Sequence, residues 1–242
     1  MAGKNPELEP NRSLLSDRAI LDQMEKGNIV ISPFKQENLG TVSYDVSLGK
    51  WYYSEEDPVG GIGIYSPYSE KDVRRVWGEP KKAVKASEYC QEYGIILPGG
   101  VEPDDLVIWI PPGETFLCHT EEFIGGRNLI TTLMKARSSI GRNFIEVCKC
   151  AGWGDVGYIN RWTMEVTNNS KHYTIPLVAG RRVAQIAFFQ VDPILGEDYT
   201  VSGKYQTAPN LKAIKAAWKP EDMLPKMWKD REVREKRKKL PL

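Results

Sequence analysis

The sequence predicts a mainly β fold: a distorted β-barrel with one short helix near the N-terminus. Short apolar segments separated by glycine and proline turns follow one another through the second half of the chain, a pattern typical of all-β barrels and sandwiches. No internal repeat is evident. Strands also do not alternate with long helical patterns, as a parallel sheet would require.

The individual elements follow from local patterns. Residues Ser16 to Gly27 predict the helix, because Ser16 can cap its first turn and Gly27 can end it. An apolar face runs from Ala19 to Met24 between these two ends. The expected strands are Ile29 to Ile31, Tyr44 to Leu48 with Gly49 as a turn, Leu106 to Ile110, Thr115 to His119, Leu129 to Met134, Phe144 to Val147, Tyr173 to Leu177 and Val183 to Val191.

At 242 residues the chain can bury one substantial core. We expect one barrel domain over residues 1–210, an insertion at about 51–105 and a basic tail over 211–242. The insertion is rich in Gly, Pro and Tyr without a sustained period, so its aromatic side chains are expected to pack on the core. The basic run from Lys226 to Lys239 predicts a solvated helix or frayed end whose removal leaves catalysis intact.

Composition excludes several classes of protein. The formal net charge of +1 gives no basic field, so no nucleic-acid partner is expected. No apolar run reaches the roughly 18 residues of a membrane span, and the first residues lack a secretory layout, which favours a cytoplasmic protein without a membrane partner. The four cysteines form no CxxC pair, and His119 and His172 lie far apart. No zinc site is expected, so any hydrolysis must activate water without protein-bound zinc.

The run from Cys148 to Asn168 places two carboxylates, Asp155 and Glu165, in a segment that otherwise predicts sheet. The period-two pattern puts Glu165 on one face with Thr163 and Arg161. The glycines that precede this strand permit tight turns and close approach by a ligand, so Asp155 is expected on a loop that leads into the strand. This arrangement is typical of a nucleotide pocket.

Each of these residues also has a simpler interpretation. Asp155 is either a turn residue bonded to its own backbone or a carboxylate that holds a sugar hydroxyl and a water. Glu165 is either an outward-facing strand residue paired with Arg161 or the acid of a site. Trp153 and Tyr158 are either core aromatics or covers for a sugar or base ring.

The segment RSSIGR, from Arg137 to Arg142, sets two hydroxyls between two arginines. Forked guanidinium donors and serine hydroxyls suit phosphate oxygens. The alternative is an ordinary surface turn.

Taken together, these segments resemble the dCTP deaminase and trimeric dUTPase superfamily over most of the chain outside the insertion and tail. Glu165 falls where the deaminases of this superfamily have their catalytic glutamate, whereas plain dUTPases lack that acid, so the deaminase branch is favoured. The segments that carry the resemblance are LSDRAILDQMEKGNIVISPF at 15–34, SYDVSLG at 43–49, RSSIGR at 137–142, AGWGDVGYINRWTMEVTN at 151–168 and GKYQ at 203–206.

The resemblance implies a homotrimer of dUTPase-like jelly-roll barrels with active sites between subunits, so that Ser138, Ser139 and Arg142 would serve a neighbour's pocket. It implies Glu165 as the proton shuttle of the reaction. Ser138 and the carbonyl of Ala151 would hold the attacking water, while Arg142 would steady the site electrostatically. The substrate-binding residues that it implies, besides Asp155 at the deoxyribose 3′-hydroxyl, are Arg137, Ser139, Trp153, Tyr158, Tyr199, Lys204, Tyr205 and Gln206.

The leading prediction is hydrolytic deamination of dCTP to dUTP and ammonia. Three alternatives stay open: a bifunctional enzyme that continues to dUMP and pyrophosphate, towards which the WGDVGY run at Trp153 to Tyr158 points, a dUTPase alone, and a nucleotide-binding regulatory protein. Magnesium is expected on the triphosphate rather than on protein ligands, and dTTP is expected as a feedback inhibitor. Two departures bear on triphosphate closure: Asn160 replaces a usual glycine, and Ala208 stands where a glutamine is expected.

Overall fold

The structure, a computed structural model, describes residues 13–58, 63–206, 208 and 210–234. The first residues and the part of the basic run that follows Arg234 lie outside the described residues, as does a short piece of the insertion at 59–62. Within the described ranges, no helix combines the length and the apolar character that crossing a membrane would take.

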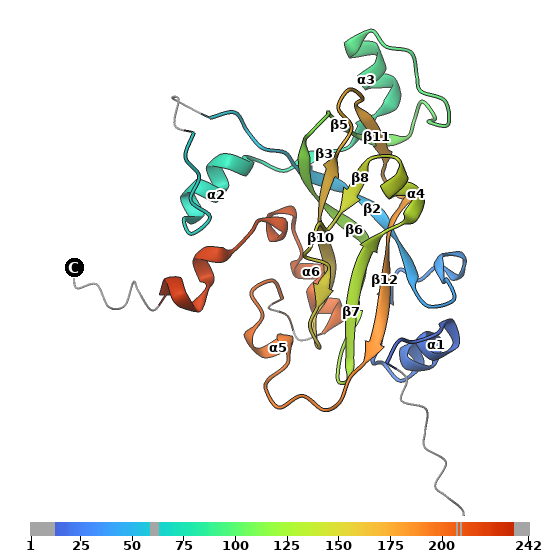
Figure 1. Ribbon diagram of the computed structural model, residues 1–242, viewed down its shortest axis with the longest axis vertical. Helices are drawn as coiled ribbons and strands as arrows, with labels where there is room; N and C mark the ends of the chain where they lie inside the picture. Colours follow the sequence, from blue (N-terminus) through green and yellow to red (C-terminus); the bar gives the residue numbers. More distant parts are fainter. Residues whose placement is uncertain (1–12, 59–62, 207, 209, 235–242) are drawn as a thin grey trace, which may run out of the picture.

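The fold is mainly β, as predicted, and its strand pairs are antiparallel. A curled sheet has the order β8-β10-β6-β2-β12-β7-β9, with β1 added on β6 and β3 on β2, and a small second sheet has the order β11-β5-β4 (Figure 1). The strands are β1 (Ile29–Ser32), β2 (Tyr44–Tyr53), β3 (Lys81–Lys82), β4 (Val84–Lys85), β5 (Leu106–Ile110), β6 (Thr115–Gly126), β7 (Ile130–Ala136), β8 (Ile145–Val147), β9 (Trp153–Gly154), β10 (Ile159–Asn168), β11 (Ile175–Val178) and β12 (Arg182–Gln190).

Short helices lie at the ends and edges of this sheet (Figure 1). The predicted N-terminal helix is confirmed: the Ser16 hydroxyl accepts a hydrogen bond from the Ala19 amide at 3.4 Å, and Gly27 follows the helix with φ +74°. The α-helices are α1 (Asp17–Glu25), α2 (Glu70–Trp77), α3 (Ala86–Tyr93), α4 (Ser138–Arg142), α5 (Tyr199–Ser202) and α6 (Leu211–Ala217), and the 3₁₀ turns are η1 (Gln36–Asn38), η3 (Pro220–Met223) and η4 (Met227–Lys229).

The expected turn at Gly49 is wrong, because β2 continues through it to Tyr53. A Cβ atom on Gly49 would lie 2.0 Å from the imidazole of His119, so the glycine makes room for a ring rather than for a turn. The imidazole takes the place of a ladder contact: its Nε2 accepts from the Trp51 amide at 3.3 Å, and its Nδ1 donates to the Thr120 carbonyl at 2.8 Å. Burial lowers the pKa of His119 to about 4, so this ring is neutral and joins β6 to β2.

The insertion is more regular than its composition indicated, since it holds α2, β3, β4 and α3. These helices escaped sequence analysis because each buries few side chains against the barrel. Val73 is the buried residue of α2, and Ala86 and Cys90 are those of α3. Each helix is also only 8 residues long, which is shorter than the window of about 11 residues or more over which a helical period is recognised.

The C-terminal segment is not the solvated tail that its charge indicated. After Gln206 the chain returns along the sheet, with α6 beside β10 (Figure 1). Ile214 packs with Phe123 and Ile159, and Trp228 is 8% exposed within a second apolar cluster. The apolar side chains of this segment are anchored on the barrel, and even the Lys226 side chain is only 14% exposed and pairs with Asp222 at 3.4 Å.

The contact between Gly49 and His119 predicts that adding a methyl group at residue 49 lowers the free energy of unfolding. We expect Gly49→Ala to destabilise the protein by about 1–3 kcal/mol, because the added Cβ must displace a buried ring between two strands. Chemical denaturation measures the change. Gly99→Ala is the matched control, since a Cβ there meets nothing within 4 Å. Equal unfolding midpoints for the two variants would contradict this account.

Candidate active site

The position of Glu165 is fixed by the pairing of β10 with β6. Along β10 the side chains of Trp162, Met164 and Val166 are buried, and the residues between them are half-buried, which confirms the predicted alternation. Glu165 lies directly opposite Leu117 of β6. The Glu165 side chain is therefore next to a buried apolar residue of the neighbouring strand.

Arg161 does not pair with Glu165, so the simpler interpretation of that glutamate is wrong. The Arg161 guanidinium lies between two aromatic rings, 4.9 Å from the centre of Phe123 and 4.6 Å from that of Trp218. Its Nε donates to the Glu121 carbonyl at 3.3 Å. Arg161 and Glu165, which the alternation places on one face of β10, therefore have different contacts.

A cavity of about 330 Å³ opens beside Glu165 and takes in several of the predicted residues. The loop before β10 and the strand itself contribute from one side, and α5 and the segment after it contribute from the other. The cavity is lined by Leu117, Ala151, Trp153, Asp155, Tyr158, Trp162, Thr163, Glu165, Tyr199, Tyr205, Met223 and Pro225. Two carboxylates, Asp155 and Glu165, therefore share one pocket that has the size of a small ligand site.

Glu165 is half-buried, and one oxygen of its carboxyl is fully buried. Among the described residues, its Oε2 atom has no hydrogen-bond partner. Burial raises the pKa of the carboxyl, and the Lys149 ammonium and a backbone hydrogen bond oppose the shift only in part. A carboxyl group with a raised pKa in a cleft is suited to taking up and returning a proton.

Asp155 lies on the turn between β9 and β10, as predicted, and its side chain is exposed to the cavity. The turn is closed by the Tyr158 amide, which donates to the Asp155 carbonyl at 3.0 Å. Gly157 adopts φ +94° within this turn, a conformation that side chains disfavour. The expectation that glycines here admit a ligand is not met at Gly154, because a Cβ there would lie 2.4 Å from the Trp162 ring.

Aromatic rings form the wall next to Asp155. Tyr158 meets Trp162 edge-on at 5.3 Å and Tyr199 edge-on at 5.0 Å, and burial raises the pKa of the Tyr158 phenol. The Tyr199 hydroxyl accepts from the Tyr205 amide at 3.3 Å, which links α5 to the GKYQ segment. Trp153 stands at the rim and is 61% exposed. The wall is largely aromatic, as suits a sugar or a base ring.

The phosphate-type motif lies elsewhere on this chain. Ser138, Ser139 and Arg142 are located on α4 and do not line the cavity at Glu165. Arg137 is held by Asp45, with 3.1 Å between Nε and Oδ2. Within one chain, therefore, the two halves of the predicted site do not meet.

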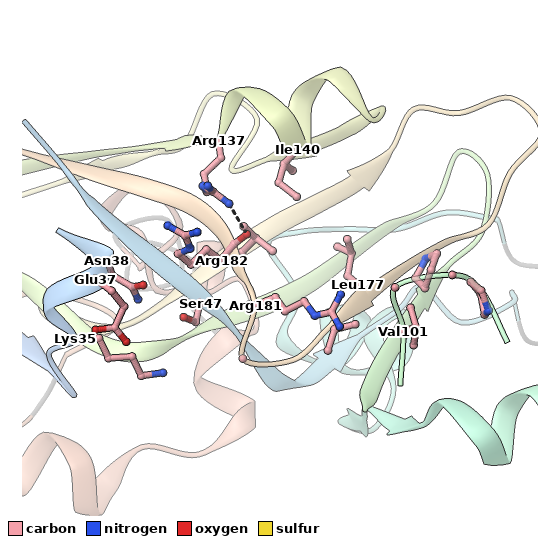
Figure 2. A pocket seen from close by; sticks show the side chains of 17 residues that line it. Lys35, Glu37, Asn38, Ser47, Val101, Arg137, Ile140, Leu177, Arg181 and Arg182 are labelled. Carbon is pink, nitrogen blue, oxygen red and sulfur yellow. Dashed lines mark hydrogen bonds between the residues drawn. The ribbon is translucent and has the colours of Figure 1, made fainter. Parts of the chain in front are cut away.

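A second cavity, of about 680 Å³, shares no lining residue with the first and takes in Arg137. In Figure 2 the guanidinium of Arg137 points toward the backbone of Arg182, whose carbonyl it reaches at 3.4 Å. The basic side chains around this cavity are paired with carboxylates: Lys35 with Glu121, Arg137 and Arg182 with Asp45, and Arg181 with Asp105. This pairing leaves little uncompensated positive charge in the cavity.

Two residues of the GKYQ segment also face away from the pocket. Gln206 is 5% exposed and bridges the start of β10: its Oε1 accepts from the Ile159 amide at 2.7 Å, and its Nε2 donates to the Gly157 carbonyl at 3.1 Å. Lys204 forms an ion pair with Asp230. Tyr205 is the member of this segment that lines the pocket with Glu165.

Sequence analysis missed several residues of the pocket wall. Thr163 could have been predicted as a wall residue, since the strand alternation puts it on one face with Glu165. Met223 and Pro225 come from the C-terminal segment and could not be placed without the structure. Their signal was the series of large apolar residues, Ile214, Trp218, Met223, Leu224 and Trp228, within a run dominated by charge.

Among the described residues, no group of three or more His, Cys, Asp or Glu side chains is arranged to hold a metal ion. The carboxylates that line the pocket and could bind a metal are Asp155 and Glu165, and many of the side chains around them are apolar. A magnesium ion that enters with its phosphate ligands fits such a pocket better than one that needs a protein cage.

Comparison with known proteins identifies the family. A model of the dCTP deaminase-like family matches residues 14–191. A relative from Hydrogenobaculum sp. (strain Y04AAS1), named dCTP deaminase, dUMP-forming, is 33% identical over 185 residues, which cover 75% of this chain and 84% of that protein. A relative of the same name from Nanoarchaeum equitans is 26% identical over 193 residues, covering 79% and 91% of the two chains.

A crystal structure of 2′-deoxycytidine 5′-triphosphate deaminase from Agrobacterium tumefaciens has a similar fold. The TM-score is 0.51 at 16% identity, and the match covers 77% of this chain. This chain spans about half, 51%, of the Agrobacterium chain. The match of the family model over most of the chain, together with the identity to the Hydrogenobaculum relative, shows that this chain belongs to the dCTP deaminase-like family.

Proposed function

We propose that this protein converts dCTP to dUMP, releasing ammonia and pyrophosphate. The observation that carries this proposal is the single cavity in which Glu165 and Asp155 lie together. The names of the similar proteins, dCTP deaminase, dUMP-forming, favour this two-step reaction over the leading sequence prediction, which stopped at dUTP. One carboxylate would then serve each step.

The first step is the exchange of the C4 amino group of cytosine for oxygen. Water adds to C4 and gives one proton to the Glu165 carboxylate, which passes it to N3. The hydroxyl now on C4 then gives its proton to the same carboxylate, which passes it to the amino nitrogen. The C4–N bond breaks, ammonia leaves and the C4 carbonyl of uracil forms. A carboxyl with a raised pKa is a better shuttle than an ordinary one, because the shift brings its pKa closer to neutral pH, where it must both accept and release the proton.

The second step is hydrolysis between the α- and β-phosphates. Asp155 would orient a second water toward the α-phosphorus and take its proton, and pyrophosphate would leave as the bond to the α-phosphorus breaks. Asp155 would also receive the 3′-hydroxyl, with Tyr158 against the sugar. Magnesium bound to the triphosphate would neutralise phosphate charge.

The motif on α4 fits this scheme if it completes the pocket of another subunit. Ser138 and Ser139 would contact phosphate, and Arg142 would steady the charge that develops at C4. Ser138 and the carbonyl of Ala151 would hold the attacking water. A homotrimer is the assembly that the resemblance implies, and dTTP inhibition, which rate measurements at increasing dTTP would test, stays a prediction of the same kind.

Substitutions at the two carboxylates should separate the two steps. We expect Glu165→Gln to lower ammonia release from dCTP by about 10²–10⁴-fold, the usual contribution of a general acid–base group, while dUTP is still cleaved. We expect Asp155→Asn to lower formation of dUMP and pyrophosphate from either nucleotide. Chromatography of the nucleotides with a parallel ammonia assay measures both.

Glu146→Gln is the matched control for these variants. Glu146 is exposed on β8, the strand next to β10, and lies opposite Thr167. Its substitution should leave both products unchanged. Full ammonia release by Glu165→Gln would sink the proposed deamination, and full dUMP formation by Asp155→Asn would sink the proposed second step.

The raised pKa of Glu165 also predicts a pH dependence of stability. Between its unfolded and folded pKa values the folded protein binds more protons at this site, so Glu165 costs stability as pH rises through that interval. Glu165→Gln removes the cost, so its melting temperature should exceed that of the wild type at neutral pH and converge with it in acid. A melting-temperature difference that is constant with pH would contradict the burial of this carboxyl.

Mixed oligomers test whether α4 serves a neighbouring subunit. Glu165→Gln and Arg142→Ala should each be inactive, because each lacks one half of every site. Random mixing of the two in equal amounts should restore about a quarter of the wild-type sites, since each site then draws its two halves independently from adjacent subunits. If mixing restores nothing while the assembly exchanges subunits, both residues belong to one chain's site.

A further inference from the structure

The family model ends at residue 191, yet part of the pocket wall comes from later in the chain. Met223 and Pro225 line the cavity beside Glu165, and Met223 is 3% exposed. Met223 packs in one apolar cluster with Leu117, the residue that lies opposite Glu165 in the sheet. A side chain from the C-terminal segment thus reaches the immediate surroundings of the candidate catalytic acid.

This segment is fastened to the barrel at its N-terminal side by Trp218. The Trp218 ring covers the guanidinium of Arg161 at 4.6 Å and meets the imidazole of His119 at 4.7 Å. The electron-rich face of the ring attracts the guanidinium charge and holds the two side chains together. Trp218 therefore docks the segment on the same two strands that carry Glu165 and Leu117.

A second attachment holds the GKYQ segment in place. The Tyr205 hydroxyl accepts from the Lys226 amide at 3.0 Å, and the Lys226 ammonium lies 5.2 Å from the Tyr205 ring. The Asn160 side chain donates to the Tyr205 carbonyl at 2.8 Å. Lys204 and Asp230 form an ion pair across the same junction. The wall around Met223 is thereby tied to a residue that itself lines the pocket.

We infer that residues 218–228 form a fixed wall of the nucleotide pocket and that Met223 is the positioning residue that limits the access of bulk solvent to Glu165 from this side. The inference rests on the proposed function for its catalytic meaning, and on the geometry for its physical content. Met223 occupies one side of the cavity with a flexible apolar chain, which suits an irregular gap. It acts on the reaction through Glu165 and through the shape of the space left for the base.

The charges that face Glu165 decide how the wall can be tested. Lys149 lies on the loop before β9, Cys148 precedes it, and Asp155, Tyr158, Tyr199 and Tyr205 line the same cavity. Met223 and Pro225 carry no charge. A change in the titration of Glu165 after substitution of Met223 therefore reports entry of water rather than loss of a charged neighbour.

Leu224 provides a matched control. Leu224 and Met223 are adjacent in sequence, are each 3% exposed and belong to one apolar cluster, but Leu224 does not line the cavity. Met223→Ala and Leu224→Ala should cost similar stability, because both delete buried apolar volume. Only the first should admit water to Glu165.

The experiment is a carboxyl titration of the full chain labelled with ¹³C-glutamate, with the Glu165 signal assigned by its loss in Glu165→Gln. We expect Met223→Ala to move the Glu165 midpoint to lower pH, Leu224→Ala to leave it in place and Met223→Leu to restore it. The acid limb of kcat/KM for ammonia release from dCTP should move in parallel, with kcat lower by about tenfold for Met223→Ala because a preorganised contact is lost.

Met223→Gln keeps the volume and adds a polar group, so it replaces Met223→Ala if that variant does not fold. An unchanged Glu165 midpoint in folded Met223→Ala or Met223→Gln, or an equal change in Leu224→Ala, would overturn the inference. A wild type that releases no ammonia from dCTP would instead refute the proposed function. In that case the titration would still decide whether Met223 shields Glu165.

Discussion

The pairing of β10 with β6 is the constraint on which the site depends. The register shifts between Arg161 and Thr163, and at this bulge the Trp162 amide donates to the Thr120 hydroxyl at 2.9 Å instead of to a ladder carbonyl. The Trp162 indole then donates to the Ile124 carbonyl at 2.9 Å and fills the core. A bulge bends a strand and redirects the side chains that follow it, which is how a sheet residue comes to face a pocket.

Much of this arrangement was predictable because it is periodic. The alternation along β10 placed Glu165 on the half-buried face, and a serine followed by an apolar face and a glycine located α1. Gly49 and the C-terminal segment were misjudged for a common reason. The role of Gly49 depends on its contact with His119, which lies far away in the sequence. The apolar residues of the C-terminal segment likewise pack on distant residues such as Leu117. A local sequence pattern does not reveal such partners.

The two departures from the superfamily pattern acquire a structural role in this chain. Asn160 uses its side chain twice, donating to the Tyr205 carbonyl and accepting from the Arg161 amide at 2.9 Å. Ala208 packs beside Ile214 and Trp218 in the cluster that docks α6. Asn160 thus joins β10 to the GKYQ segment, and Ala208 belongs to the apolar contact of α6 with the sheet. Each departure has a structural role next to the C-terminal part of the chain.

The order in which the pocket is assembled depends on where its walls lie in the sequence. Ribosomes release a chain from its N-terminal end, so every strand of the barrel emerges before Met223 and Pro225 do. Until these two residues arrive, the cavity beside Glu165 lacks one of its sides, and solvent can reach the carboxylate from there. A chain that stops before Met223 therefore lacks one side of the cavity, although it contains every strand of the sheet.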